Sequence, residues 1–486
     1  MRGAFALLIA LIALVSLFVL ERDRWALSPE HIEIGDTPAT FWQPPGPLPG
    51  APVIVIAHGF AGSQQMMQEI SRDLAFAGFP VLAFDFLGHG RHPLPLSGDV
   101  TRIEGATARL VDQTVAVAQA AGRLTGADTL ALIGHSMATD VMIRAAERLE
   151  NVTATVAISM YSEAVTDTYP PRLLIISGEW EPRLREVALQ ALHLIAPEAD
   201  EGETVTQGDV MRRAIAAPRV EHVGVLYSPT TLSETRAWIA GAANLAPNET
   251  PPPDWPWRLA LLSAIVILFR PLTRILPQRP RIDAVSLRGG ELAALLALPI
   301  LPAATVALTL TWSPTGIAGF ASLSAFFATW GGVQLALLWR LGARLHAPVA
   351  GGMAMLTLGA LVFSLALDRY GAAFVPVGPR ITETLILLIG ALPFMLADTM
   401  IAWRAPWWQR IAARTLLLIV LASVMIADST RLGVMFTILP VLVLFWAVFG
   451  TMGAWVARRQ GLETAALPLA LILAWSIAAS TPLFAG

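Results

Sequence analysis

Residues 129–149 read TLALIGHSMATDVMIRAAERL, and they give the clearest indication of how the chain folds. It opens on a short, mostly apolar run, Thr129–Ile133, which is typical of a strand that is covered on both faces. From residue 136 onward the apolar residues recur at helical spacing, which predicts a helix over 136–149. Only a tight turn joins the two elements, so the chain must reverse its direction sharply at Ser136.

The turn itself carries a candidate nucleophile. A serine between a strand and a helix is the setting of a nucleophile elbow, which exposes the hydroxyl above a sheet. The residues two positions before and after the serine must be small, and Gly134 and Ala138 meet this condition. Because serine needs a neighbouring base to become a strong nucleophile, Ser136 is a candidate only if such a base is near. The Met137 N–H, directly after it, is a candidate oxyanion donor.

A second turn supplies a candidate for the other oxyanion donor. The sequence HGFAGS, residues 58–63, directly follows a predicted strand that ends at Ala57. A turn there can aim the Phe60 N–H at a reacting carbonyl oxygen, and two such donors stabilise the transition state more than the substrate. The alternative is that His58 and the two glycines only shape the turn, with Gly59 and Gly62 supplying its unusual backbone dihedrals.

Short apolar runs alternate with helical patterns over residues 30–245, which predicts a parallel α/β sheet. The predicted strands are Val53–Ala57, Val81–Asp85, Thr129–Ile133, Thr155–Ser159 and Arg172–Ser177. The predicted helices cover residues 64–77, 102–124, 136–149, 183–195 and 228–242. The polar stretch 196–215 is expected to be a loop near the site.

Residues 30–242 resemble the α/β-hydrolase superfamily of serine hydrolases. The resemblance rests on the His58 turn, on DFLGHG at residues 85–90, and on the nucleophile elbow, in the order of that family. It implies a mostly parallel sheet with helices on both faces. Only about a dozen residues, 161–171, follow the strand after the elbow, so we expect no cap domain there.

The resemblance also implies an acid and a base, in the chain order Ser, Asp or Glu, His. The matching acid is Glu181, in the turn after the strand that ends at Ser177. The base is His222, which would take the proton of Ser136 while the acid fixes its tautomer. Three other acids remain as alternatives to Glu181: Glu179, Asp167 and Asp209.

The composition excludes several functional classes. The chain has 486 residues, of which 55% are hydrophobic and only 14% charged, and it contains no cysteine. Disulfides and thiolate catalysis are therefore excluded. The chain shows no clustered basic face, so we expect no nucleic-acid partner. No metal-ligand motif is present, so we expect no metal and no cofactor.

The hydrophobic excess lies at the two ends of the chain. Residues 4–20 are uncharged, which predicts an uncleaved anchor at 1–21, with a cleaved signal peptide as the alternative. The α/β domain is predicted at 25–245, a Pro-rich linker at 246–256, and a membrane domain at 257–486. About eight apolar runs in that domain are long enough to span a bilayer. They lie near 257–275, 291–312, 316–339, 348–367, 381–402, 415–430, 432–455 and 464–485.

Charge placement predicts the orientation. Residues 21–255 carry 16 arginines against 29 acids, net −13, whereas residues 256–486 carry 16 arginines against 7 acids, net +9. With nine helices and Arg2 in the cytoplasm, most arginines of the short loops fall inside, as the positive-inside rule requires. The α/β domain is then periplasmic, in the inner membrane of a bacterium. A cytoplasmic domain is the competing topology.

Together these features predict a membrane-anchored serine esterase that resembles carboxylesterases and lipases and acts on a small-molecule or lipid acyl ester. A serine peptidase or amidase is the first alternative, because the same residues serve both reactions. A non-catalytic module that regulates a membrane transporter is the second. In the membrane domain, Asp398 is the most embedded acid, and we interpret it as a helix-packing carboxylate, with a functional role as the alternative.

Overall fold

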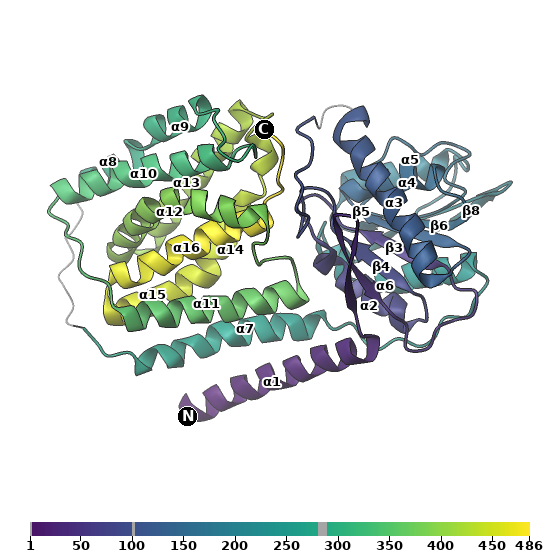
Figure 1. Ribbon diagram of the computed structural model, residues 1–486, viewed down its shortest axis with the longest axis horizontal. Coiled ribbons are helices and arrows are strands. Elements are labelled where there is room, and N and C mark those ends of the chain that lie inside the picture. Colours follow the sequence, from purple (N-terminus) through teal and green to yellow (C-terminus); the bar gives the residue numbers. More distant parts are fainter. Residues whose placement is uncertain (1, 100–102, 280–288) are drawn as a thin grey trace. The chain divides into compact units, whose positions relative to one another are not determined.

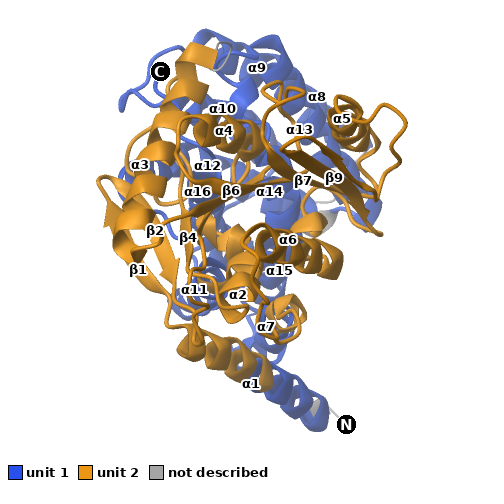
Figure 2. Cartoon of the chain, turned by 90° about the vertical axis from the view of Figure 1, so that its right-hand side faces the viewer, with its two compact units in different colours: residues 1–14, 261–368, 374–486 blue, residues 15–260, 369–373 orange. Residues whose placement is uncertain are grey.

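The computed structural model describes residues 2–99, 103–279 and 289–486 (Figure 1). The chain divides into two compact units (Figure 2). Unit 1 comprises residues 1–14, 261–368 and 374–486, and unit 2 comprises residues 15–260 and 369–373. The first helix, α1 (Arg2–Leu27), and the helix α7 (Trp255–Leu272) each contribute residues to both units.

Unit 2 contains one nine-stranded sheet with the strand order β1-β2-β4-β3-β5-β6-β7-β9-β8. The strands are β1 (Glu30–Ile34), β2 (Thr37–Trp42), β3 (Val53–Ala57), β4 (Val81–Phe84), β5 (Leu130–His135), β6 (Val152–Ile158), β7 (Arg172–Gly178), β8 (Thr204–Gln207) and β9 (Val210–Ala217). The pairs from β4 to β9 are parallel, and β1, β2 and β8 pair antiparallel at the two edges.

Helices cover both faces of this sheet, as the sequence predicts. The helices of unit 2 are α2 (Gln68–Phe76), α3 (Ala108–Thr125), α4 (Met137–Glu147), α5 (Pro182–His193) and α6 (Pro229–Ala242), with short turns at Gln64–Met67, Ile103–Thr107 and Gly224–Tyr227. Successive strand residues point to opposite faces. Val156 packs in the core that α2 and α6 cover, and Ala157 packs in the core that α4 and α5 cover.

The five predicted strands are confirmed as β3 to β7 with end shifts of a few residues. The predicted loop over 196–215 is wrong, because residues 204–217 form the antiparallel pair β8 and β9. The buried Arg212 in β9 hides this strand from a hydrophobicity pattern; it donates to the Ala191 carbonyl oxygen at 2.7 Å. Of the helix predicted over 102–124, residue 102 lies outside the described residues. Residues 159–171 contain no helix or strand, in accord with the expected absence of a cap.

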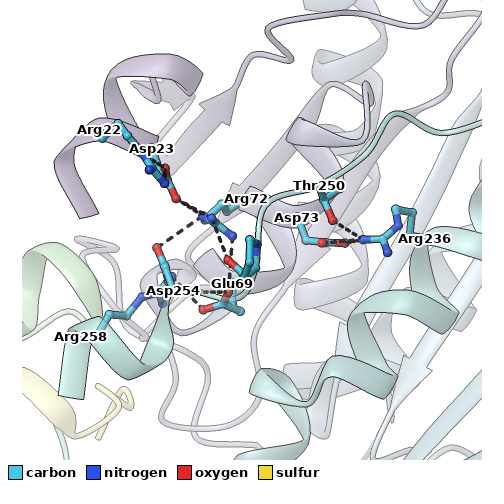
Figure 3. Close-up of polar contacts among 10 residues, drawn as sticks. Arg22, Asp23, Glu69, Arg72, Asp73, Arg236, Thr250, Asp254 and Arg258 are labelled. Carbon is cyan, nitrogen blue, oxygen red and sulfur yellow. Dashed lines mark hydrogen bonds and ion pairs between the residues drawn. The ribbon is translucent and has the colours of Figure 1, made fainter. Parts of the chain in front are cut away.

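Within unit 2, a buried ionic cluster ties the end of α1 and the start of α7 to α2 (Figure 3). We call it the α2 cluster, and it consists of Asp23, Glu69, Arg72, Asp254 and Arg258. Arg72 lies between Asp23 at 2.5 Å and Asp254 at 3.5 Å. Arg258 contacts Glu69 at 3.2 Å and also pairs with Asp254. Because breaking a buried ion pair leaves an uncompensated charge, the cluster fixes where both segments join the sheet domain.

Unit 1 is helical. Its helices, besides the shared α1 and α7, are α8 (Gly289–Ala297), α9 (Ile300–Thr309), α10 (Phe320–Arg340), α11 (Ala350–Tyr370), α12 (Pro379–Arg404), α13 (Trp407–Ala427), α14 (Ile438–Phe445), α15 (Thr451–Gln460) and α16 (Leu462–Ser480), with short turns at Thr273–Ile275, Gly433–Met435 and Trp446–Gly450. Glycines allow close packing here: a Cβ on Gly331 would clash with the backbone of Phe394.

Among the described residues, eight helices are long and apolar enough to cross a membrane, and the chain is a membrane protein on this ground. The sequence predicts nine, and the difference is α7, which forms but does not count among the eight. Arg258 and Arg270 lie near its two ends. Arg258 is buried against two carboxylates in the α2 cluster, so the first turn of α7 belongs to the sheet domain.

Candidate active site

Ser136 lies at the junction of β5 and α4 in a strained backbone conformation, with φ 53° and ψ −119°. A residue with a side chain adopts such a positive φ only where the surrounding structure enforces it, and such sites concentrate where function requires them. A Cβ on Gly134 would lie 2.5 Å from the Ala138 carbonyl oxygen, so only glycine fits there. The tight turn predicted from the sequence is therefore present, and it leaves Ser136 half-buried at the end of the strand.

His222 lies between Ser136 and Glu181. Its Nε2 is 2.9 Å from the Ser136 Oγ, and its Nδ1 is 2.5 Å from the Glu181 Oε1. The three residues come from three different turns, after β5, β7 and β9, that all follow the carboxyl ends of parallel strands. The geometry is that of a serine, a base and an orienting acid in one hydrogen-bonded chain.

Glu181 is held in place through its second oxygen. The Glu181 Oε2 accepts hydrogen bonds from the Ser159 hydroxyl at 2.7 Å and from the Gly178 N–H at 2.6 Å. Burial favours a higher pKa for Glu181, but the hydrogen bonds from His222, Gly178 and Ser159 outweigh burial and leave the pKa below its ordinary value. Glu181 is therefore a carboxylate at neutral pH and can stabilise a positive charge on His222.

The alternative acids lie elsewhere. The Glu179 side chain is exposed and accepts a hydrogen bond from the Arg219 N–H at 2.6 Å. The charge of Asp167 acts on Arg212, and Asp209 lies in the turn between β8 and β9. Of the four acids that the sequence offers, the structure brings Glu181 to His222.

His135 positions the backbone of the candidate base, a contact that the sequence does not reveal. Its Nε2 is 2.8 Å from the His222 carbonyl oxygen. Burial, with the neighbouring His222, lowers the pKa of His135 to about 4, so the ring is neutral at neutral pH. A neutral ring with its proton on Nε2 donates to that carbonyl. Neither the role of Ser159 nor that of His135 could be predicted from the sequence, because neither residue belongs to a motif around its partner.

His58 shapes the turn that carries Phe60. The Phe86 N–H donates to its Nε2 at 3.2 Å, so its proton is on Nδ1, which donates to the Gly59 carbonyl oxygen at 2.8 Å. Burial lowers the pKa of His58. The sequence predicts unusual backbone dihedrals for Gly59 and Gly62, but neither has a positive φ. In this turn the residue with a positive φ is Ala61, at 56°.

Gly59 and Gly62 are required in this turn for their lack of a side chain. A Cβ on Gly59 would lie 3.0 Å from the Ser136 Cβ, and one on Gly62 would lie 2.9 Å from the Gly59 carbonyl oxygen. The turn therefore passes directly beside Ser136. Met137 is the first residue of α4, where an amide has no acceptor within its own helix. The roles of Phe60 and Met137 as oxyanion donors stay predictions.

Large apolar side chains are exposed beside the site residues. Trp180 precedes Glu181 and is 63% exposed, Val223 follows His222 and is 43% exposed, and Tyr161 is 66% exposed. The Tyr161 N–H donates to the Thr139 hydroxyl, which is three residues from Ser136. Apolar side chains close in sequence to the site residues are therefore open to solvent. In the part of the chain that the structure describes, no group of three or more potential ligands could hold a metal ion.

Comparison with known proteins agrees with the sequence resemblance. Residues 50–201 match the family of hydrolases described as serine aminopeptidase, S33. Ser136 and Glu181 lie within the matched segment, and His222 lies beyond it. The α/β-hydrolase resemblance is thereby confirmed over this segment, and the match supports a hydrolase. No curated protein matches the chain.

Solved structures similar to this chain include three enzymes. A soluble variant of monoglyceride lipase from Saccharomyces cerevisiae is 11% identical, and the match covers 44% of this chain and 94% of the lipase, with a TM-score of 0.33. Proline iminopeptidase from Mycobacterium smegmatis is 12% identical over 44% of this chain and 99% of the peptidase, with a TM-score of 0.33. A bacterial membrane phospholipase A is 14% identical over 50% of this chain and 96% of the phospholipase, with a TM-score of 0.32.

Proposed function

We propose that unit 2 is a serine hydrolase that cleaves a carboxylic ester through an acyl-Ser136 intermediate. The observation that carries the proposal is the continuous chain from the Ser136 hydroxyl through both nitrogens of His222 to the ionised Glu181. A hydroxyl that is 2.9 Å from an imidazole can transfer its proton at the moment of attack. The second oxygen of Glu181 accepts hydrogen bonds from Ser159 and Gly178, which holds the first oxygen at His222.

In the first half of the reaction, His222 takes the proton of Ser136 while the oxygen attacks the ester carbonyl carbon. The developing oxyanion faces the turn after β3 and the start of α4, where the Phe60 and Met137 N–H groups are our proposed donors. His222 then donates its proton to the leaving alcohol, and acyl-Ser136 remains. In the second half, His222 activates a water molecule, which releases the carboxylic acid and restores the serine.

The exposed side chains of Trp180, Val223 and Tyr161 support an apolar acyl group as the substrate. A site without a covering domain is open to a large substrate, and an ester at a lipid surface fits both features. An aminopeptidase is the second candidate, because the matched family is described by that activity. Both reactions proceed through the same residues, so the substrates distinguish them.

The test uses the purified full-length protein with p-nitrophenyl esters of short, medium and long acyl chains, and with aminoacyl p-nitroanilides. We expect the rate of ester hydrolysis to increase with the length of the acyl chain, and we expect a fluorophosphonate probe to label the protein. Ser136→Ala should abolish both, whereas Ser233→Ala, an exposed serine on α6, should leave both intact. Equal labelling of wild type and Ser136→Ala would disprove the nucleophile, and hydrolysis of the anilides alone would assign a peptidase.

We also propose that α7 is a ninth span and that unit 2 lies on the periplasmic side of a bacterial inner membrane, because nine spans place most arginines of the short loops in the cytoplasm. Protease added to spheroplasts should then digest unit 2 without lysis. Protection of unit 2 until the cells are lysed would assign it to the cytoplasm.

A further inference from the structure

Unit 1 contains a cavity of about 280 Å³ between α12, α13, α15 and α16, helices that pack together in this unit (Figure 1). Its wall includes Arg410 and Arg414 from α13, Arg458 from α15 and Asp398 from α12. Three arginines against one aspartate give the cavity wall a net charge of +2. A cavity wall with this net charge attracts an anion.

One of the three arginines is neutralised within the protein. Arg414 forms two hydrogen bonds to Asp398, at 2.9 and 3.3 Å, and its guanidinium lies 4.9 Å from the centre of the Trp446 ring. Asp398 therefore acts as a packing carboxylate, as the sequence analysis favours, and its partner is Arg414. The side chain of Arg404, its neighbour in sequence, lies outside the described residues.

The other two arginines, Arg410 and Arg458, have exposed side chains in the cavity wall, and both add to its positive potential. Arg458 is close enough to Arg410 and Arg270 for their positive charges to act on it. Arg410 donates its Nε–H to the Ala405 carbonyl oxygen at 2.8 Å, which leaves its terminal nitrogens as donors. Across residues 2–99, 103–279 and 289–486, no carboxylate forms an ion pair with Arg410 or Arg458.

The cavity lining also includes apolar side chains, among them Met395 of α12 and Leu469 of α16. Met395 lies nearer the middle of α12 than Asp398 does. The cavity thus combines positively charged side chains with an apolar end at Met395 and Leu469. Its volume is near the lower limit for ligand sites, which suits a head group with the first part of a chain.

We propose that this cavity binds the phosphate group of an anionic amphiphile, with Arg410 and Arg458 as its ligands. The planar guanidinium presents paired donors that match phosphate oxygens. Both arginines fall among the residues predicted on the cytoplasmic side, and anionic lipids attract basic groups at that surface. An anionic phospholipid and free inorganic phosphate share this chemistry, and the lipid also fills the apolar end. The site lies wholly in unit 1 and does not depend on the proposed esterase.

The test is native mass spectrometry of the purified full-length protein in detergent, titrated with phosphatidylglycerol, phosphatidylcholine or inorganic phosphate. We expect wild type to bind phosphatidylglycerol more tightly than phosphatidylcholine. The double variant Arg410→Gln/Arg458→Gln should bind phosphatidylglycerol about tenfold more weakly. Arg340→Gln, an exposed arginine at the end of α10 outside the cavity, should bind like wild type.

Each remaining outcome decides the proposal. Inorganic phosphate that binds as tightly as phosphatidylglycerol, and only with both arginines present, supports the site and identifies free phosphate as the source. Equal binding of both lipids, or equal binding of phosphatidylglycerol by wild type and the double variant, overturns it. If the double variant does not fold, Asp398→Asn replaces it. This change removes the one acid of the cavity wall and should tighten phosphatidylglycerol binding, and unchanged or weaker binding overturns the proposal.

Discussion

The pKa values of two buried glutamates of unit 2, Glu181 and Glu69, are shifted in opposite directions. Glu181 is 8% exposed and Glu69 is fully buried, so burial disfavours the charge of both. Three hydrogen-bond donors contact Glu181, and its pKa lies below the ordinary value. Burial raises the pKa of Glu69 to about 7, the nearby Asp254 adds to the rise, and Arg258 and Arg72 oppose it.

The difference shows what decides the charge of a buried acid. Hydrogen-bond donors that contact only one carboxylate stabilise its ionised form and lower its pKa. An arginine that is shared among several carboxylates stabilises the charge of each one less. In the α2 cluster, Arg72 and Arg258 serve three carboxylates between them (Figure 3). In the candidate active site, one acid has three donors of its own. Three substitutions test this difference between the two glutamates.

The largest effect is expected from Glu181→Gln. The amide keeps the shape of the side chain but removes the charge that orients and stabilises protonated His222, which typically lowers kcat by about 10⁴-fold. The measurement is p-nitrophenyl ester hydrolysis by the full-length protein. Glu179→Gln is the matched control and should change kcat less than about tenfold, since its side chain contacts Arg219 instead. If Glu179→Gln lost most of its activity while Glu181→Gln stayed active, the assignment of Glu181 as the acid would be wrong.

A smaller effect is expected from Ser159→Ala, which removes one of the donors to Glu181. We expect kcat to fall about tenfold with KM unchanged, because a hydrogen bond to a charged group is lost. The pKa of Glu181 should rise, so the acidic limb of the pH profile moves to higher pH. A Ser159→Ala variant with a wild-type pH profile would show that this contact does not position the acid.

The smallest effect is expected from Glu69→Gln, and it appears in stability. A carboxyl whose pKa is higher in the folded than in the unfolded state stabilises the fold at low pH and loses that contribution as pH rises through the folded pKa. Glutamine resembles the protonated acid. The variant should unfold at the wild-type temperature near about pH 5, and be more stable by about 1–2 kcal/mol near about pH 8.

Thermal unfolding of the full-length protein in detergent measures this difference. Glu186→Gln, an exposed glutamate on α5, is the control and should not change the pH dependence. A Glu69→Gln variant that is destabilised equally at both pH values would mean that Glu69 is ionised throughout and that its pairing with Arg258 dominates.

The central strands could be predicted from sequence because each is an apolar run that the sheet buries on both faces. The edge strands could not. The residues of β1 are half or fully exposed, β2 contains Pro38, and β8 is mostly exposed. At these positions pairing with a neighbour, not composition, makes the strand. The helices of unit 1 also differ in charge: α16 has one charged residue, Glu463 in its first turn, whereas α7 has an arginine near each end.

The central strands, the sharp turn at Ser136 and the candidate nucleophile could be predicted from the sequence, because they depend on local spacing and on small residues at fixed positions, and the candidate base followed from the family resemblance. The folded structure was needed to show which acid contacts His222, which hydroxyl supports that acid, and which arginines of unit 1 have no carboxylate partner among the described residues. Such contacts join residues that are far apart in the chain. Their energies depend on distance and burial, which arise only when the strands and helices pack.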